Sequence, residues 1–259
     1  MEKIAASDSV DITVSVVSHL QIELVAQLLA DIDAHCADSR LEVILTLNIS
    51  EHLSFELTGY SFPVKLIRNV SAKGFGANHN QAFRHASGRY FCVMNPDIRL
   101  ASNPFGFLLT CFADSSVGVV APLVLGENGE IEDSARRFPS PLKILCKAFG
   151  GCRGADYDVT HAPIFPDWVG GMCMVFPSAI FKKLEGFDQR FFLYYEDVDL
   201  CGRLMLSGYK AVVCPQAKVI HHAQRSSHRN FKYFRWHLTS MIRFFLSPVY
   251  WRLLSRYWL

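Results

Sequence analysis

The sequence predicts an α/β fold with a mainly parallel central sheet flanked by helices. Strand-like and helix-like segments alternate in its N-terminal part, and this β-α-β order is typical of parallel strands joined by helices. Half of the 259 residues are hydrophobic and 19% are charged, which supplies a sizeable core and excludes a disordered chain. In such sheets, ligands bind at the carboxyl ends of the strands.

The individual elements follow from residue periodicity. Runs rich in Val, Ile and Leu predict strands at 11–18, 41–47, 64–69 and 91–95. Helical spacing of apolar residues predicts helices at 21–35 and at 78–86, where Ser87-Gly88 ends the second one. The segment 126–166 is rich in Gly, Pro and charge and predicts long loops.

Charge is distributed unevenly along the chain. Residues 1–199 hold 24 acids and 16 Lys/Arg, a net charge of −8, whereas residues 200–259 hold ten Lys/Arg and no acid, a net charge of +10. A basic end suits an anionic partner such as a membrane surface or a nucleic acid. No recognisable nucleic-acid-binding module accompanies this charge. A membrane surface is therefore favoured, and no nucleic acid is expected as a partner.

The location of the protein is predicted from absent signals. The start of the chain lacks a basic segment followed by an apolar stretch, and no run of apolar residues is long enough to span a bilayer. The eight cysteines form no CxxC pair, and several lie in apolar runs. We therefore expect free thiols and a cytoplasmic protein.

Two segments suggest a site for a phosphate-bearing ligand. Lys73-Gly74 opens a glycine-bearing loop that leads into a helix containing Asn80, and a helix N-terminus favours phosphate. Asn95-Pro96-Asp97 ends a buried strand, and a carboxylate there suits a divalent cation bridging to phosphate oxygens. The alternatives are that the loop at Lys73-Gly74 is a purely structural turn and that Asp97 only caps a turn or the next helix.

Two further segments suggest catalytic chemistry. Glu196, Asp197 and Asp199 follow the apolar run 191–195, and apolar surroundings raise carboxyl pKa values as a general base requires. The alternative is that these acids only cap a helix. His221-His222 ends an apolar run and offers a metal ligand, or else is structural.

Taken together, these segments resemble family 2 of the inverting glycosyltransferases, and in particular its bacterial rhamnosyltransferase-like branch. The resemblance covers about residues 10–226 and is carried by KGFG (73–76), NPD (95–97), EGFDQRFFLYYEDVDL (185–200) and AKVIHH (217–222). It implies a GT-A fold, in which a nucleotide-sugar-binding sheet merges with an acceptor-binding half.

The resemblance also implies roles for individual residues. The metal, Mg²⁺ or Mn²⁺, would be held by Asp97 and His221, with His222 as the fallback. Asp197 would be the catalytic base, with Glu196 beside it. The remaining implied residues bind the two substrates. Those on the donor side are Ser18, Asn48, Lys73, Gly74, Asn80, Asn95 and Asp97, and those on the acceptor side are Trp168, Gly170, Gly171 and Asp199. For Glu196 and Asp199, the alternative is a structural role.

One departure from the family pattern concerns the nucleotide base. Leu47 stands where the family has the acid of its "DNxS" sequence. The donor expected from the resemblance is dTDP-rhamnose or a related nucleotide-sugar, and Leu47 provides no acid to contact its nucleotide base.

The C-terminal residues predict a separate amphipathic tail. Apolar residues at 231, 234, 238, 241, 242 and 245 form a helical stripe, and ten aromatic residues lie between Phe231 and Trp258. We expect a glycosyltransferase domain at 1–226 and a basic-aromatic helical tail at 227–259. The tail would bind the inner face of the cell membrane peripherally, or pack on the domain or on a second copy.

The function that follows is transfer of a sugar, with rhamnose or a related deoxyhexose expected, from a nucleotide-sugar to a hydroxyl of a lipid-linked glycan. Surface polysaccharide assembly, as in lipopolysaccharide biosynthesis, is the expected setting. The alternatives are a non-catalytic nucleotide-sugar-binding or assembly protein of the same fold, motivated by Leu47 and Asn95, and a metal-dependent hydrolase of nucleotide-sugars.

Overall fold

The computed structural model describes residues 10–148, 151, 154–222 and 231–258. Its main sheet contains β1 (Ile12–Ser18), β2 (Leu41–Leu47), β3 (Val64–Arg68), β4 (Tyr90–Met94), β5 (Ile98–Arg99), β6 (Val117–Leu125), β9 (Cys173–Pro177) and β10 (Lys210–His221). A second, two-stranded sheet pairs β7 (Ala135–Arg136) with β8 (Trp168–Val169).

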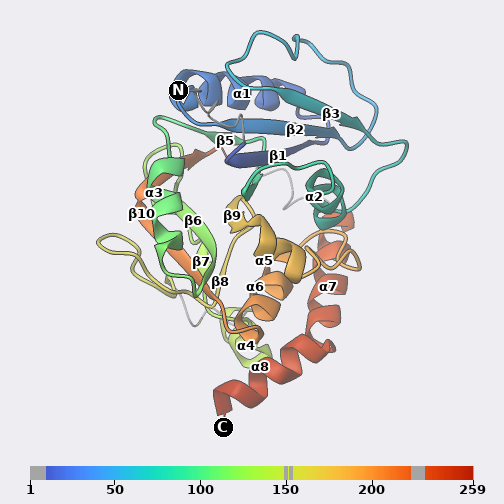
Figure 1. The fold of residues 1–259 in the computed structure, drawn as a ribbon. Coiled ribbons are helices and arrows are strands. Elements are labelled where there is room, and N and C mark those ends of the chain that lie inside the picture. Colours follow the sequence, from blue (N-terminus) through green and yellow to red (C-terminus); the bar gives the residue numbers. More distant parts are fainter. Residues whose placement is uncertain (1–9, 149–150, 152–153, 223–230, 259) are drawn as a thin grey trace.

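The main sheet has the order β3-β2-β1-β4-β9-β6-β10-β5 (Figure 1). Neighbouring strands from β3 to β4 are parallel, as are β6 and β10. The exceptions are β9, which is antiparallel to both of its neighbours, and the short edge strand β5. The predicted α/β fold with a mainly parallel central sheet is therefore confirmed.

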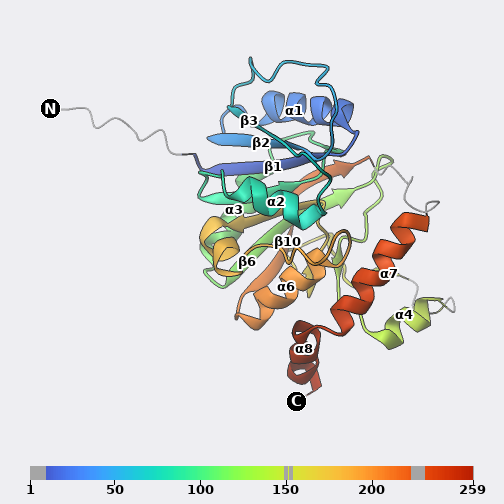
Figure 2. The ribbon, with the colours of Figure 1, turned by 90° about the vertical axis from the view of Figure 1, so that its right-hand side faces the viewer.

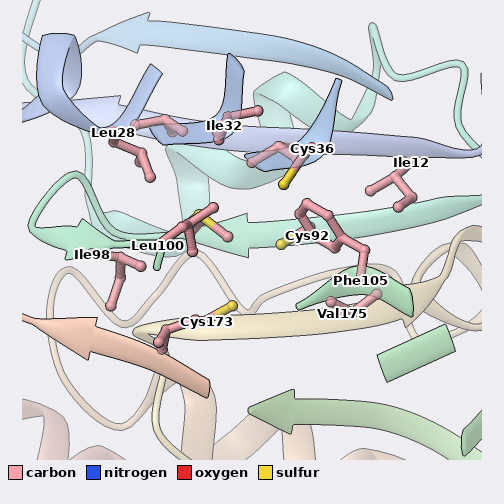
Figure 3. Packing of buried hydrophobic residues seen from close by; sticks show 14 of the residues in the cluster. Ile12, Leu28, Ile32, Cys36, Cys92, Ile98, Leu100, Phe105, Cys173 and Val175 are labelled. Carbon is pink, nitrogen blue, oxygen red and sulfur yellow. The ribbon is translucent and has the colours of Figure 1, made fainter. Parts of the chain in front are cut away.

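Helices cover both faces of this sheet. They are α1 (Ile22–Cys36), α2 (Phe75–Phe83), α3 (Phe105–Thr110), α4 (Pro141–Ala148), α5 (Ser178–Lys183), α6 (Glu196–Leu206), α7 (Phe231–Phe245) and α8 (Pro248–Trp258). Residues of α1 and α3 share one buried apolar cluster with the strands, and Figure 3 shows Leu28, Ile32 and Phe105 in it beside Cys92 of β4. Residues of α2, α5 and α6 belong to a second cluster.

The segment 126–166 is more ordered than predicted. The expectation of long loops is wrong for β7 and α4, which lie within it. The helix α4 begins at Pro141, a residue favoured at a first helical position, where its missing N–H costs nothing. Leu142 and Leu145 on this helix are exposed, so part of its apolar face is left uncovered by the described residues.

Cysteine chemistry is mostly as expected. Among the residues that the structure describes, Cys36, Cys92, Cys111, Cys173, Cys201 and Cys214 are free, and most of them are buried. Cys146 of α4 is disulfide-bonded, so the expectation of free thiols is wrong at that residue.

The tail forms two helices that both pack on the domain and expose apolar residues. Phe244, Tyr250 and Leu253 are buried in a third apolar cluster with Phe191 and Val198. The predicted stripe, in contrast, faces mainly outward, with Phe231, Phe234, Leu238 and Ile242 exposed. The helix α7 ends at Phe245, and Pro248, which has no N–H with which to continue that helix, begins α8.

Figure 2 shows α7 at the side of the molecule, with α4 next to it and α8 below. The predicted domain boundary between residues 226 and 227 lies outside the described residues. None of the helices in the described ranges is long and apolar enough to cross a membrane.

Candidate active site

The carboxyl ends of β1, β2 and β4 meet at one edge of the sheet. Ser18 ends β1, and its carbonyl accepts a hydrogen bond of 2.9 Å from the N–H of Asn48, the residue after β2. Asn95 follows β4, and its N–H donates to the carbonyl of Met172 at 2.8 Å. This edge is where a ligand of a parallel sheet is expected, and it carries the predicted donor-binding residues.

Strand pairing brings Asp97 and His221 together. The edge strand β5 starts directly after Asp97 and pairs with the end of β10, so that Ile98 lies opposite His221. The carbonyl of Asp97 accepts from the N–H of His222 at 2.9 Å, and His221 Nε2 lies 3.3 Å from Asp97 Oδ2. Residues 97 and 221 are thus held side by side by the backbone.

A second carboxylate holds the other side of the same imidazole. His221 Nδ1 lies 2.8 Å from Glu132 Oε2. Burial alone would lower the pKa of His221, but the hydrogen bonds and charges of Asp97 and Glu132 raise it to about 9.

The pair formed by Asp97 and His221 fits a divalent cation that also binds substrate oxygens. Asp97 Oδ1 is buried and has no hydrogen-bond partner in the described part of the chain, which leaves an oxygen for such an ion. In the described ranges, no group of three or more His, Cys, Asp or Glu side chains is arranged to hold a metal. His222 instead lies 3.6 Å from the exposed Glu127, which favours His221 as the ligand.

Asp197 is held by backbone N–H groups at the start of α6. Its Oδ1 accepts from the N–H of Val198 at 2.8 Å, and its Oδ2 accepts from the N–H of Gly171 at 3.0 Å. Burial raises the pKa of Asp197 above its ordinary value, and these hydrogen bonds and the charge of Arg136 limit the rise. The result is a fixed carboxylate that is more basic than an exposed aspartate, as a general base requires.

The backbone that presents this carboxylate is strained. Tyr194 and Tyr195 have φ values of 68° and 67°, a left-handed conformation that costs a non-glycine residue about 1–3 kcal/mol. Glu196 is buried, and its Oε2 has no hydrogen-bond partner among the described residues. Burial, and then the charge of Asp197, raise the pKa of Glu196 well above its ordinary value. The burial of Glu196, the acid next to Asp197, therefore disfavours its charged form.

A short turn joins the metal-ligand candidate to the base. Met172 accepts from Asn95, two residues before Asp97, while Gly171, next to Met172 in the chain, donates to Asp197. The predicted metal ligand and the predicted base therefore lie at the same edge of the sheet, linked through this turn.

The glycine-bearing loop also reaches this edge. A Cβ at Gly74 would lie 2.6 Å from the carbonyl oxygen of Phe192, so only glycine allows that approach. Asn48 holds the loop in place, because its side chain accepts from the N–H of Lys73 at 2.8 Å and donates to the carbonyl of Lys73 at 3.0 Å. The side chain of Lys73 bonds to Gln81.

Two of the predicted binding residues make structural contacts. Asn80 exchanges two hydrogen bonds with the backbone of Phe187, at 2.7 and 2.9 Å. Asp199 is buried and pairs with Arg203 at 2.7 Å, and Arg203 binds the carbonyl of Gly186. These contacts favour the structural alternative for Asp199; the predicted binding role of Asn80 stays a prediction.

A cavity of about 330 Å³ opens beside Asp197, the predicted base. Its walls include Trp168, Tyr194 and His237, together with the two acids Glu196 and Asp197. Trp168 is fixed by a hydrogen bond of 3.0 Å from its Nε1 to the carbonyl of Arg137. Gly170 supports the same wall by donating to the carbonyl of Ser134 at 2.9 Å.

Three residues of interest were not predicted from the sequence. Glu132 and Arg136 act on His221 and Asp197 but lie in the segment taken as loops. Glu51 follows β2, and both of its carboxylate oxygens are buried without a hydrogen-bond partner in the described part of the protein. For Glu132 and Arg136, the sequence signal that was available is the mixture of acidic and basic residues within 130–137.

The fold and the arrangement of Asp97, His221 and Asp197 agree with the sugar transferases that the sequence resembles. The model of the family described as glycosyltransferase-like family 2 matches residues 46–239. The chain belongs to this family, as its sequence predicts.

Comparison with individual proteins agrees with this assignment. The chain is 29% identical over 244 residues to the rhamnosyltransferase WbbL of Escherichia coli, covering 88% of this chain and 90% of that protein. It is 30% identical over 150 residues to the N-acetylglucosaminyl-diphospho-decaprenol L-rhamnosyltransferase of Mycobacterium tuberculosis, covering 53% of this chain and 48% of that protein.

Solved structures share the fold. The structure of GalNAc-T7 with UDP, GalNAc and Mn²⁺ has a TM-score of 0.66 at 14% identity and covers 92% of this chain and 48% of that one. The mannosyltransferase PcManGT from Pyrobaculum calidifontis, solved with GDP-Man and Mn²⁺, has a TM-score of 0.62 at 18% identity and covers 91% of this chain and 65% of that one. At these identities, the likeness establishes the GT-A fold alone.

Proposed function

We propose that this protein is a metal-dependent inverting glycosyltransferase that moves rhamnose or a related deoxyhexose from a nucleoside diphosphate to a hydroxyl of a lipid-linked glycan. The names of the E. coli and mycobacterial relatives support the sugar, and the mycobacterial name supports a lipid-linked acceptor. The observation that carries the proposal is Asp197, a fixed carboxylate of raised pKa at the wall of the cavity.

The proposed reaction is a single displacement. The acceptor hydroxyl gives its proton to Asp197 while its oxygen forms a bond to the anomeric carbon. The bond from that carbon to the phosphate oxygen breaks on the opposite face, and the nucleoside diphosphate leaves with the electron pair. A bound Mg²⁺ or Mn²⁺ would stabilise the charge of this leaving group. Asp97 and His221 would hold the cation, and the loop around Lys73 and Gly74 would border the donor.

Two observations keep a second function open. Leu47 is buried in β2, so no carboxylate stands at that position to bind a nucleobase. Asn95 cannot supply the second charge of an Asp-x-Asp metal motif. A non-catalytic nucleotide-sugar-binding protein, or a nucleotide-sugar hydrolase, would also fit these two residues.

A donor panel separates these functions. The protein is incubated with dTDP-rhamnose and with other nucleotide-sugars in the presence of Mn²⁺, and nucleoside diphosphate release is measured with and without a lipid-linked glycan acceptor. Release that needs the acceptor supports transfer, whereas release without it indicates hydrolysis. Binding of a donor without any release indicates the non-catalytic alternative.

Glu132 provides a test of metal binding that does not depend on turnover. Glu132 accepts from His221 Nδ1, which leaves Nε2 free to face Asp97 and a cation, and removing such a partner typically weakens metal binding about 10–100-fold. We expect Glu132→Ala to raise the dissociation constant of Mn²⁺ by this factor, measured calorimetrically in the presence of a nucleoside diphosphate.

The matched control for this prediction is Glu127→Ala, which removes the exposed carboxylate beside His222. We expect it to leave Mn²⁺ binding unchanged. If Glu127→Ala weakened binding and Glu132→Ala did not, His222 would be the ligand.

We propose further that the tail places the enzyme on the inner face of the cell membrane. The exposed row on α7 is apolar, and the last 60 residues carry ten Lys/Arg and no acid, which suits an anionic leaflet. The combined variant Phe234→Ser, Leu238→Ser and Ile242→Ser should sediment with anionic liposomes at least about tenfold less, because each buried large apolar side chain contributes about 1.5–3 kcal/mol.

Phe107→Ser, which changes an exposed aromatic residue on α3, serves as the control and should sediment like the unchanged protein. High salt should release the unchanged protein only in part, since salt does not screen apolar contacts. Equal sedimentation of the triple variant would show that α7 is a packing element alone.

A further inference from the structure

The segment 190–195, which leads into α6, connects the glycine-bearing loop to Asp197. The carbonyl of Phe192 accepts a hydrogen bond of 2.8 Å from the N–H of Phe75, and this is the carbonyl that Gly74 approaches closely. Tyr195 immediately precedes α6, whose first turn contains Asp197. The position of this one segment therefore affects both the loop on the donor side and the proposed base.

The backbone of segment 190–195 needs support from outside. Tyr194 and Tyr195 are consecutive left-handed residues, with φ values of 68° and 67°. Residues other than glycine keep this conformation only where the surrounding structure holds them in it. The neighbours of the segment should therefore include the element that maintains the position of Asp197.

The helix α7 provides this support, and Figure 2 shows it running along the side of the molecule. Ser240 is buried, and its Oγ donates to the carbonyl of Leu193 at 2.9 Å, directly before the two strained tyrosines. The ring of His237 lies 5.3 Å from that of Tyr194 and 5.5 Å from that of Tyr195. The other contacts are those of Trp236 with Phe192, of Arg243 with Arg190 and Phe191, and of Phe244 with Tyr195. Every residue of segment 190–195 thus contacts α7.

These contacts lie on one face of α7, and the proposed membrane contact lies on another. The residues that touch the segment recur at helical spacing, at positions 236, 237, 240, 243 and 244. The exposed apolar row consists of Phe231, Phe234, Leu238 and Ile242. His237 also lines the cavity together with Asp197. A helix that served only as a membrane anchor would need none of the contacts on the first face.

We infer that α7 belongs to the active site, where Ser240 and His237 are positioning residues that hold segment 190–195 and thereby place Asp197 against the acceptor hydroxyl. The inference rests on the proposed function, since it assumes that Asp197 is the base. Ser240 and His237 act through the segment and not on the reacting atoms. Their loss should therefore lower kcat more than it weakens substrate binding, because a displacement of a reacting group by about 1 Å can cost about 10²-fold in rate.

The first test is Ser240→Ala, assayed with a water-soluble acceptor analogue so that membrane binding does not enter the measurement. Loss of this buried hydrogen bond should lower kcat about tenfold, while the KM for the acceptor and the dissociation constant of the donor stay within about twofold. Thr239→Ala is the matched control, because the hydroxyl of Thr239 bonds to the carbonyl of Arg235 within α7 itself. It should leave kcat unchanged.

The second test compares two variants of His237. His237→Ala removes both ring contacts with the tyrosines and should lower kcat about fivefold. His237→Phe keeps an aromatic ring at this position and should retain most of the activity. If His237→Phe were as inactive as His237→Ala, the imidazole would act on a substrate directly, and its positioning role would be wrong.

Hydrogen exchange gives a readout that does not depend on activity. The backbone amides of residues 190–198 should exchange faster in Ser240→Ala than in Thr239→Ala, and thermal unfolding shows whether each variant is folded. Unchanged kcat and unchanged exchange in Ser240→Ala overturn the inference and leave the proposed transfer intact, as does a raised acceptor KM at unchanged kcat. If Ser240→Ala does not fold, the two His237 variants decide. If the unchanged protein transfers no sugar, the proposed function fails, and the exchange rates still decide whether α7 holds the segment.

Discussion

Asp197→Asn is expected to lower the transfer rate by about 10²–10⁴-fold, the usual contribution of a general base. The amide keeps the shape of the side chain and can still accept a hydrogen bond from Gly171 or Val198, but it cannot take a proton from the acceptor. Donor binding should be largely retained, because the lost interaction matters mainly in the transition state. Single-turnover transfer and calorimetric donor binding measure the two effects.

Glu196→Gln is the matched comparison, since it changes the neighbouring acid in the same way. Burial raises the pKa of Glu196 well above its ordinary value, which disfavours the carboxylate form that a base needs, so Glu196→Gln should reduce the rate far less. If Glu196→Gln were the more damaging change, the roles of the two acids would be reversed.

The pH dependence of transfer provides a second check on the base. Asp197 must be ionised to act, so its contribution is present above its pKa and is lost as the pH falls through it. Burial raises this pKa from the ordinary 3.8, and the acid limb of the rate profile should therefore lie above that of an exposed aspartate. Glu196, Arg136, Tyr195 and Cys201 are the titratable or charged groups that act on Asp197 or respond to it.

The strands and the carboxylates at their ends could be predicted because their signals are local. The run into Asn95-Pro96-Asp97 predicts both the strand and its end, and the structure ends β4 at Met94. The closeness of Asp97 and His221 came only from the family resemblance, since these residues are 124 positions apart in the numbering and meet through the pairing of β5 with β10.

The parts that could not be predicted depend on tertiary contacts. Glu132 gains its role only because the chain after β6 passes beside the end of β10, where His221 lies. The apolar stripe of the tail left two possibilities open, membrane binding or packing on the domain, and the structure exposes most of the stripe while it buries Phe244, which lies off it. Periodicity shows that a helix has an apolar face, but it does not show which face the rest of the molecule covers.

Asp97→Ala is expected to lower transfer by at least about 10³-fold, since a cation that stabilises a leaving group contributes several kcal/mol. The structural reason is that Asp97 faces His221 at 3.3 Å and keeps a buried oxygen without a hydrogen-bond partner in the described part of the chain. Excess chelator should have the same effect on the unchanged protein, and Mg²⁺ or Mn²⁺ should restore its activity but not that of the variant.

Asp114→Ala is the matched control for this prediction, because Asp114 is an exposed aspartate whose nearest cation, Lys210, lies 3.9 Å away on the surface. It should leave both transfer and Mn²⁺ binding unchanged. Thermal unfolding of Asp97→Ala distinguishes loss of the metal from loss of the fold, and a folded variant should no longer bind Mn²⁺ together with a nucleoside diphosphate. Full activity of the unchanged protein in excess chelator would contradict the metal assignment.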